Sequence, residues 1–190
     1  MQFKPALLTF TLSAALLAGC STTHYIDISP KADIKTNTYT NNKVIEVLTT
    51  TKLSKTVGAI DTGIKEHADI LIANDIKESV KESVLEGIKA LGFTPEQGLL
   101  PASTIAIEIS KMSYTTKVET LKTVATLDFE LKVTTTAKGQ IYKANYGSQK
   151  IKEYGTMPFR ETVEEDMTDL ASQTVTRLLN DSNVIILLKD

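Results

Sequence analysis

The sequence predicts an α+β fold, in which a mostly antiparallel sheet carries two amphipathic helices on one face as a two-layer sandwich. Two patterns lead to this prediction. Residues 103–110 and 123–133 alternate apolar and polar side chains, which is typical of antiparallel strands with one solvated face. Residues 76–91 and 162–180 repeat apolar residues at helical spacing. Because each pattern leaves an apolar surface to bury, we expect the helices to cover the sheet.

The amino terminus predicts an export signal. The apolar run at 5–18 is about 14 residues long, whereas a membrane-spanning helix needs ~20. A positively charged start, a short apolar core and small residues before Cys20 are typical of a secretory signal peptide. We therefore predict a signal peptide at 1–19, a lipidated start and short tether at 20–23, and one periplasmic domain at 24–190.

The single cysteine ends the stretch Leu17-Ala18-Gly19-Cys20, which resembles the lipobox of bacterial lipoproteins. The resemblance implies that the Cys20 thiol receives diacylglycerol and that its amine is acylated after cleavage. Such a Cys20 would hold the chain at a membrane, because stable anchoring takes two lipid signals. Ser21 in place of Asp implies the outer membrane, facing the periplasm. The alternative is an ordinary cysteine near a transmembrane anchor, which would lack a disulfide partner.

Strands are expected before the first helix. HYIDIS at 24–29 alternates and predicts a first strand that ends at Pro30. The polar residues 31–42 predict a loop. Residues 43–54 are rich in β-formers, and the apolar kernel at 70–72 could form a short buried strand.

The first helix has start and stop signals. Asp75 with Glu78 three residues later resembles a capping box, and Gly92 is placed to end the helix. Its apolar stripe consists of Ile76, Val80, Val84, Ile88 and Leu91.

The centre of the chain predicts a three-strand meander. The alternating strands at 103–110 and 123–133 are followed by a turn at Lys138-Gly139 and a returning strand at 141–155. A second helix is expected from Thr162, where Thr162 and Glu165 form another capping box. The apolar tail at 184–188 fits either an edge strand or a docked segment.

At this level the chain resembles the YajG family of bacterial lipoproteins. The matching features are the lipobox, IDISP after it, the helix ending KALGF, the strand ending YGSQKIKEYG and the terminal helix DLASQTVTRLLND. The resemblance implies an exported, lipid-anchored protein. It carries over no catalytic residues.

Few residues suggest chemistry. The two histidines, His24 and His67, are far apart in sequence, whereas a zinc site needs three or four ligands. Asp61-Thr62-Gly63 starts like a calcium loop but does not continue as one. Asp128 and Glu130 are expected on a solvated strand face, and no G-x-S-x-G motif occurs. We therefore expect no enzyme activity, no cofactor and no metal.

The net charge of −2 gives no electrostatic footprint for nucleic acid. Tyr142, Tyr146 and Tyr154 form the candidate interaction surface if their strand face is outward. The alternative is that these rings cover the edge of the core or pack under a helix.

The resulting hypothesis is a non-enzymatic, lipid-anchored envelope protein that binds another envelope protein through a sheet edge or an open sheet face. The first alternative is a module that binds a small envelope ligand, such as a cell-wall fragment or a lipid. A cell-wall hydrolase is the weakest alternative, because no nucleophile or metal set is visible.

Overall fold

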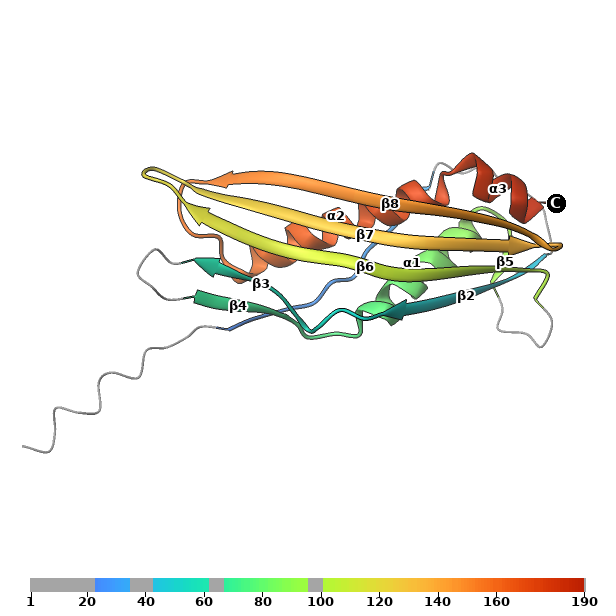
Figure 1. Ribbon diagram of the computed structural model, residues 1–190, viewed down its shortest axis with the longest axis horizontal. Helices are drawn as coiled ribbons and strands as arrows, with labels where there is room; N and C mark the ends of the chain where they lie inside the picture. The colour runs from blue at the N-terminus through green and yellow to red at the C-terminus, as the bar shows by residue number, and fades with distance from the viewer. Residues whose placement is uncertain (1–22, 35–42, 62–66, 96–100, 190) are drawn as a thin grey trace, which may run out of the picture.

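The computed structural model describes residues 23–34, 43–61, 67–95 and 101–189. The predicted signal peptide and Cys20 lie outside the described residues. The described part is an elongated sheet of long strands with helices packed on one face (Figure 1). This arrangement confirms the predicted α+β class.

The meander predicted from the alternating segments is present. Strands β6 (Ser103–Val118), β7 (Thr123–Ala137) and β8 (Gln140–Tyr154) pair antiparallel along their length. Lys138 and Gly139 join β7 to β8 with φ angles of 47° and 78°. Positive φ at both central residues matches the right-handed twist of a two-residue hairpin, so the turn sets the register of both strands.

The rest of the sheet is not antiparallel. Strands β2 (Val44–Thr51) and β3 (Thr56–Asp61) both run parallel to β6, on the edge that β7 leaves open. Strand β4 (His67–Ile72) pairs antiparallel with β3. Strands β1 (His24–Ile26) and β5 (Thr94–Pro95) run parallel to β4 and β2. The sheet is therefore mixed, and β3 is a strand that the sequence analysis missed.

The parallel pairing follows from the chain path. Between β2 and β6 the chain forms helix α1 (Ile76–Ala90), and parallel strands need such a crossover to return in the same direction. The predicted caps of α1 are present, because Asp75 accepts a hydrogen bond from the Lys77 amide at 3.0 Å and Gly92 has φ 88°. Gly92 takes the left-handed conformation that commonly ends a helix.

Two predictions about the C-terminal part were wrong in detail. Helix α2 (Arg160–Leu179) begins before Thr162, and its N-cap is Phe159 without a side-chain hydrogen bond, so the predicted capping box is absent. The apolar tail is not an edge strand but a docked helix, α3 (Ser182–Lys189). Its buried residues are Val184, Leu187 and Leu188. A short apolar run fits a strand or a buried helix equally well, so periodicity alone could not decide.

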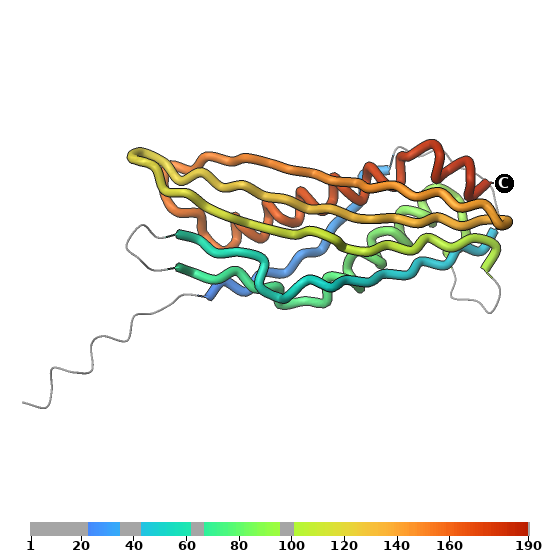
Figure 2. The backbone as a smooth tube through the Cα atoms, in the orientation of Figure 1, coloured from blue at the N-terminus to red at the C-terminus, as the bar shows by residue number. Residues whose placement is uncertain are grey.

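The core lies between the sheet and the helices, as the backbone trace in Figure 2 shows. Alternate residues of the long strands point into it, including Ile107, Leu127 and Phe129, which are almost fully buried. Val80 and Val84 of α1 and Leu170 of α2 face them and are also buried.

The segment after β1 is held along α2 by side-chain to backbone hydrogen bonds. Polar residues of α2 spaced four apart form a stripe on the helix surface, because such positions share one face. The amides of Asp27, Lys31 and Asp33 donate to Glu164, Ser172 and Thr176 at 3.0, 3.0 and 2.9 Å. Ile26 and Ile28 are fully buried. The start of the domain is therefore part of its core.

Candidate functional site

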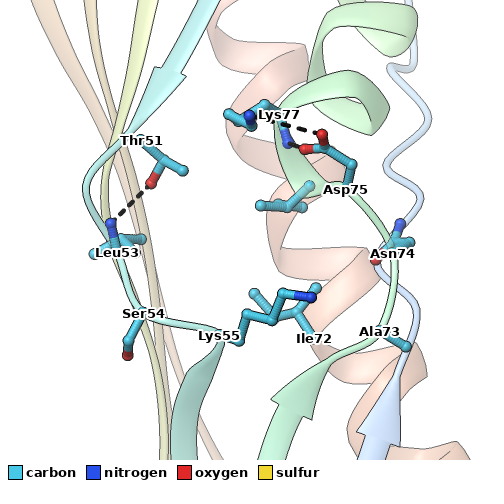
Figure 3. Close-up of a pocket in the computed structure, with 10 residues that line it drawn as sticks. Thr51, Leu53, Ser54, Lys55, Ile72, Ala73, Asn74, Asp75 and Lys77 are labelled. Carbon is cyan, nitrogen blue, oxygen red and sulfur yellow. Dashed lines mark hydrogen bonds and ion pairs between the residues drawn. The ribbon is translucent and has the colours of Figure 1, made fainter.

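A cleft opens where the sheet divides. Strand β2 pairs with β6 up to Ile109, and β3 joins β6 only at Tyr114, with a register shift between Ile109 and Lys111. The link between β2 and β3 forms one wall, and the turn from β4 into α1 forms the other (Figure 3). The cleft has a volume of about 430 Å³. This size suits a small molecule.

The cleft combines an apolar side with two cationic side chains. Ile72 and Ile76 are nearly buried, and Leu53 is half-buried on the opposite wall. The side chain of Lys55 extends across the opening, and Lys77 lies at the start of α1 (Figure 3). Such a lining would suit an apolar molecule with an acidic or polar group.

The other polar groups of the cleft hold its walls together. Thr51 Oγ donates to the Ile109 carbonyl at 3.1 Å and accepts from the Leu53 amide at 3.1 Å. Asn74 bonds both backbone groups of Ile28, at 3.1 and 2.9 Å. Asp75 caps α1. Because these hydrogen bonds are made within the protein, the amides and hydroxyls of the cleft are poorly placed for recognition or catalysis.

The tyrosines singled out in the sequence lie on the face that the helices cover. Tyr142 and Tyr146 donate to the same oxygen of Asp181, at 3.0 and 2.6 Å, where α2 passes into α3. Burial and the hydrogen bond to Asp181 raise the pKa of Tyr146 well above its usual value. Burial alone would raise the pKa of Asp181, but the hydrogen bonds from Tyr146 and neighbouring groups lower it overall.

Tyr154 belongs to a second buried cluster. It donates to Asp166 of α2, which is 1% exposed and forms an ion pair with Lys152. Tyr114 donates to the Tyr154 hydroxyl at 3.4 Å. Burial, as the largest cause, raises the pKa of Tyr114 to about 12. It likewise raises that of Tyr154, where the Asp166 hydrogen bond adds to it.

Both clusters attach the helices to β8. Tyrosines with raised pKa values stay protonated near neutral pH, so they act as hydrogen-bond donors to the two aspartates. Their rings also pack against the core. This geometry favours the interpretation in which Tyr142, Tyr146 and Tyr154 pack under helices, and it leaves them little open surface.

The remaining candidates stay apart. Asp128 on the open sheet face accepts from Lys111, Ser113 and Gln149, and these bonds lower its pKa despite the opposing effect of burial. Burial and the nearby Arg160 charge lower the pKa of His24. The described residues hold no group of three side chains that could bind a metal ion. The turn at Asp61-Thr62-Gly63 lies mostly outside the described residues.

The sheet face away from the helices is open, and β8 forms its edge. Among the described strands, β8 pairs only with β7. Two large apolar residues of β8 point to the open face, Ile141 at 64% and Ile151 at 66% exposure. Arg177 of α2 donates to the Gly147 carbonyl at 2.7 Å, the one printed side-chain contact to this strand's backbone. The edge therefore presents backbone groups and apolar side chains together.

Within the described residues, none of the helices has the length and apolar character to span a bilayer.

Comparison with known proteins gives a family match. A family model described as "Uncharacterized lipoprotein" matches residues 30–189. No curated protein matches this chain in sequence.

Solved structures share the fold at low sequence identity. Protein XCC0632 from Xanthomonas campestris is 10% identical with a TM-score of 0.57, and the match covers 87% of this chain and 95% of that one. A structure from Helicobacter pylori, described as a neuraminyllactose-binding hemagglutinin homolog, is 7% identical with a TM-score of 0.50. That match covers 83% of this chain and 95% of the other. At such identities the likeness concerns the fold alone.

Proposed function

This chain belongs to the family of uncharacterised lipoproteins, and on that premise we propose that it is a lipid-anchored envelope protein that binds another envelope protein without catalysing a reaction. The observation that carries the proposal is the open sheet face ending in the edge of β8. A lipidated domain with one helix-covered face and one open face has a single broad surface left for a partner.

The anchor is proposed at Cys20. Its lipobox, followed by Ser21, supports attachment to the outer membrane on the periplasmic side and a place in the YajG family. Only three residues separate Cys20 from His24, where β1 begins. The domain would therefore lie directly against the membrane.

The proposed partner supplies an extended segment that adds to the sheet beside β8. Addition of a strand satisfies backbone groups of the edge, and the side chains at alternate positions give specificity. Ile141 and Ile151 would supply apolar contacts. Lysines on an edge strand, such as Lys143 and Lys150, oppose unspecific pairing, so a specific partner would have to complement their charge.

The absence of catalysis is supported by the use of the buried polar groups. Asp166 and Asp181 are engaged with tyrosines between sheet and helices, and Asp128 is engaged with Lys111 on the open face. A general acid or base would need to reach a substrate, and these carboxylates instead bond neighbouring side chains.

Site-specific photo-crosslinking in living cells tests the binding surface. A photoreactive residue would be placed at Ile141 or Ile151 and, as a matched control, at Leu48, which is exposed on β2 across the sheet. We expect one and the same envelope protein, identified by mass spectrometry, from both β8 positions and not from Leu48. Equal products from all three positions, or none, would contradict the proposal.

The cleft favours a second candidate function, the binding of a small envelope ligand. Its volume of about 430 Å³ and its mixed lining are the supporting observations. Native mass spectrometry of protein extracted from envelopes would show a bound small molecule of constant mass. Lys55→Glu should reduce that bound fraction if the ligand is acidic, whereas Lys143→Glu on β8 should leave it unchanged.

A further inference from the structure

Exposed apolar side chains gather at one end of the elongated molecule, where β6 and β8 finish and α2 begins (Figure 1, left). We call this surface the apolar end. Of the nine large hydrophobic residues exposed in the described part of the chain, five belong to it: Tyr25, Val118, Leu121, Met157 and Phe159. Leu121 is 88% and Phe159 74% exposed. Such a concentration marks an interaction site more strongly than scattered exposed residues do.

Three separate segments build the apolar end. Val118 pairs with Thr123 across the turn from β6 to β7, and Thr123 in turn pairs with Tyr154 at the end of β8. The chain then leads from β8 into α2, where Arg160 donates to the Tyr25 carbonyl at 3.3 Å. The turn, the connection and β1 therefore meet at the same end of the molecule.

The charged side chains around the apolar end are paired with one another. Because opposite charges neutralise each other there, the surface offers little net charge to an acidic or basic partner. The ion pairs are Lys122–Glu153 at 2.6 Å, Lys117–Glu119 at 3.7 Å and Arg160–Glu161 at 2.8 Å. An apolar occupant suits such a surface best.

The chain preceding β1 identifies that occupant. Strand β1 begins at His24, four positions after Cys20, and four extended residues reach at most about 14 Å. With Cys20 acylated, the end of the domain that carries β1 must therefore lie within that distance of the lipid. A protein partner on this end would have to fit into the narrow space between domain and bilayer.

We propose that the apolar end inserts Leu121, Phe159 and Tyr25 into the interfacial region of the phospholipid bilayer that holds the Cys20 acyl chains. The inference rests on the lipidation in the proposed function. Aromatic rings such as Phe159 and Tyr25 are favoured at the level of the headgroups. The insertion is a second membrane contact beside the lipid, and it sets the long axis of the domain upright on the membrane. The open face and the β8 edge then stand free of the bilayer.

The composition of the chain provides a direct test, because it contains no tryptophan. Leu121→Trp and Phe159→Trp each introduce a single fluorophore at the apolar end, and Ile186→Trp and Ile141→Trp place matched, exposed controls at the opposite end. The full-length lipidated protein is reconstituted into vesicles of phosphatidylethanolamine and phosphatidylglycerol, with and without brominated acyl chains. All four positions are exposed, so folding should be preserved, and circular dichroism checks it.

We expect brominated lipid to quench the two apolar-end variants several-fold more than the two controls, with a blue-shifted emission that added salt does not reverse. Equal quenching at both ends in protein that sediments with the vesicles would overturn the inference and leave the lipid anchor intact. Protein that stays in the supernatant would refute the anchor itself, and with it the basis of the inference.

Discussion

The close approach of β3 to β6 makes Gly58→Ala a sharp test of the sheet topology. A methyl group at Gly58 would lie 1.7 Å from the Tyr114 carbonyl oxygen and 2.7 Å from its carbon. These are backbone atoms of a central strand, so no side-chain rotation can relieve the overlap. The two strands would have to separate by more than an ångström, which breaks the parallel pairing at Gly58–Tyr114 and Ala59–Thr115.

The cost can be worked out from what this separation removes. Two backbone hydrogen bonds contribute about 1 kcal/mol each, and each buried group left without a partner costs about 1–3 kcal/mol more. Partial exposure of Val57 and Ile60 adds to the loss. We expect the free energy of unfolding to fall by about 3–5 kcal/mol, which is a large share of the ~5–15 kcal/mol of a typical domain.

Urea denaturation followed by far-ultraviolet circular dichroism measures this loss. Gly147→Ala is the matched control, because its added methyl group would lie no closer than 3.9 Å to Glu130 Cγ. Alanine there should be neutral or stabilising by about 0.5–1 kcal/mol, as expected for glycine within a strand. If Gly58→Ala and Gly147→Ala unfolded at similar urea concentrations, the parallel contact between β3 and β6 would be refuted.

Four further predictions concern the helix contacts and the anchor. Asp166→Ala should lower the unfolding free energy in urea by about 2 kcal/mol, less than a fully buried pair costs, because Lys152 keeps contact with water. The pKa of Asp181 is lowered in the folded state, so it stabilises the fold above its ordinary pKa of 3.8 and loses this effect as the pH falls through the lowered value. The stability difference between Asp181→Asn and the parent should therefore shrink in acid-unfolding curves. Ser172→Ala should raise the hydrogen-exchange rate of the backbone amide that it binds, with about 1 kcal/mol lost at most. Cys20→Ala should give an unprocessed precursor in the inner-membrane fraction, and a soluble product of mature size would contradict the anchor.

Strong local patterns were sufficient for most of the elements. The alternation at 123–133 and the Lys138-Gly139 turn correctly predicted β7 and the hairpin to β8. The stripe from Ile76 to Leu91, with its Asp75 cap, correctly predicted α1. These patterns suffice because side chains at period 2 or 3.6 share one face whatever the partner.

The candidate site was harder to predict. The cleft depends on the gap between β2 and β3, and β3 was missed because residues 56–61 are short and do not alternate clearly. The tyrosine positions were noticed, but which face of β8 the helices cover is not written in that strand. A signal existed in Asp166 and Asp181, two acids at either end of the α2 stripe, although nothing local links them to Tyr154 or Tyr146.

The sequence by itself determined the lipobox at Cys20, the two-layer character of the domain and the central meander. Local spacing decides these features, since each depends on neighbouring residues alone. Only the tertiary structure decided that β2 and β3 run parallel to β6, that 184–188 is helical, and that 27–33 lies along α2. These features join residues far apart in the chain, and their stability comes from burial and hydrogen bonds that exist only once both partners have folded.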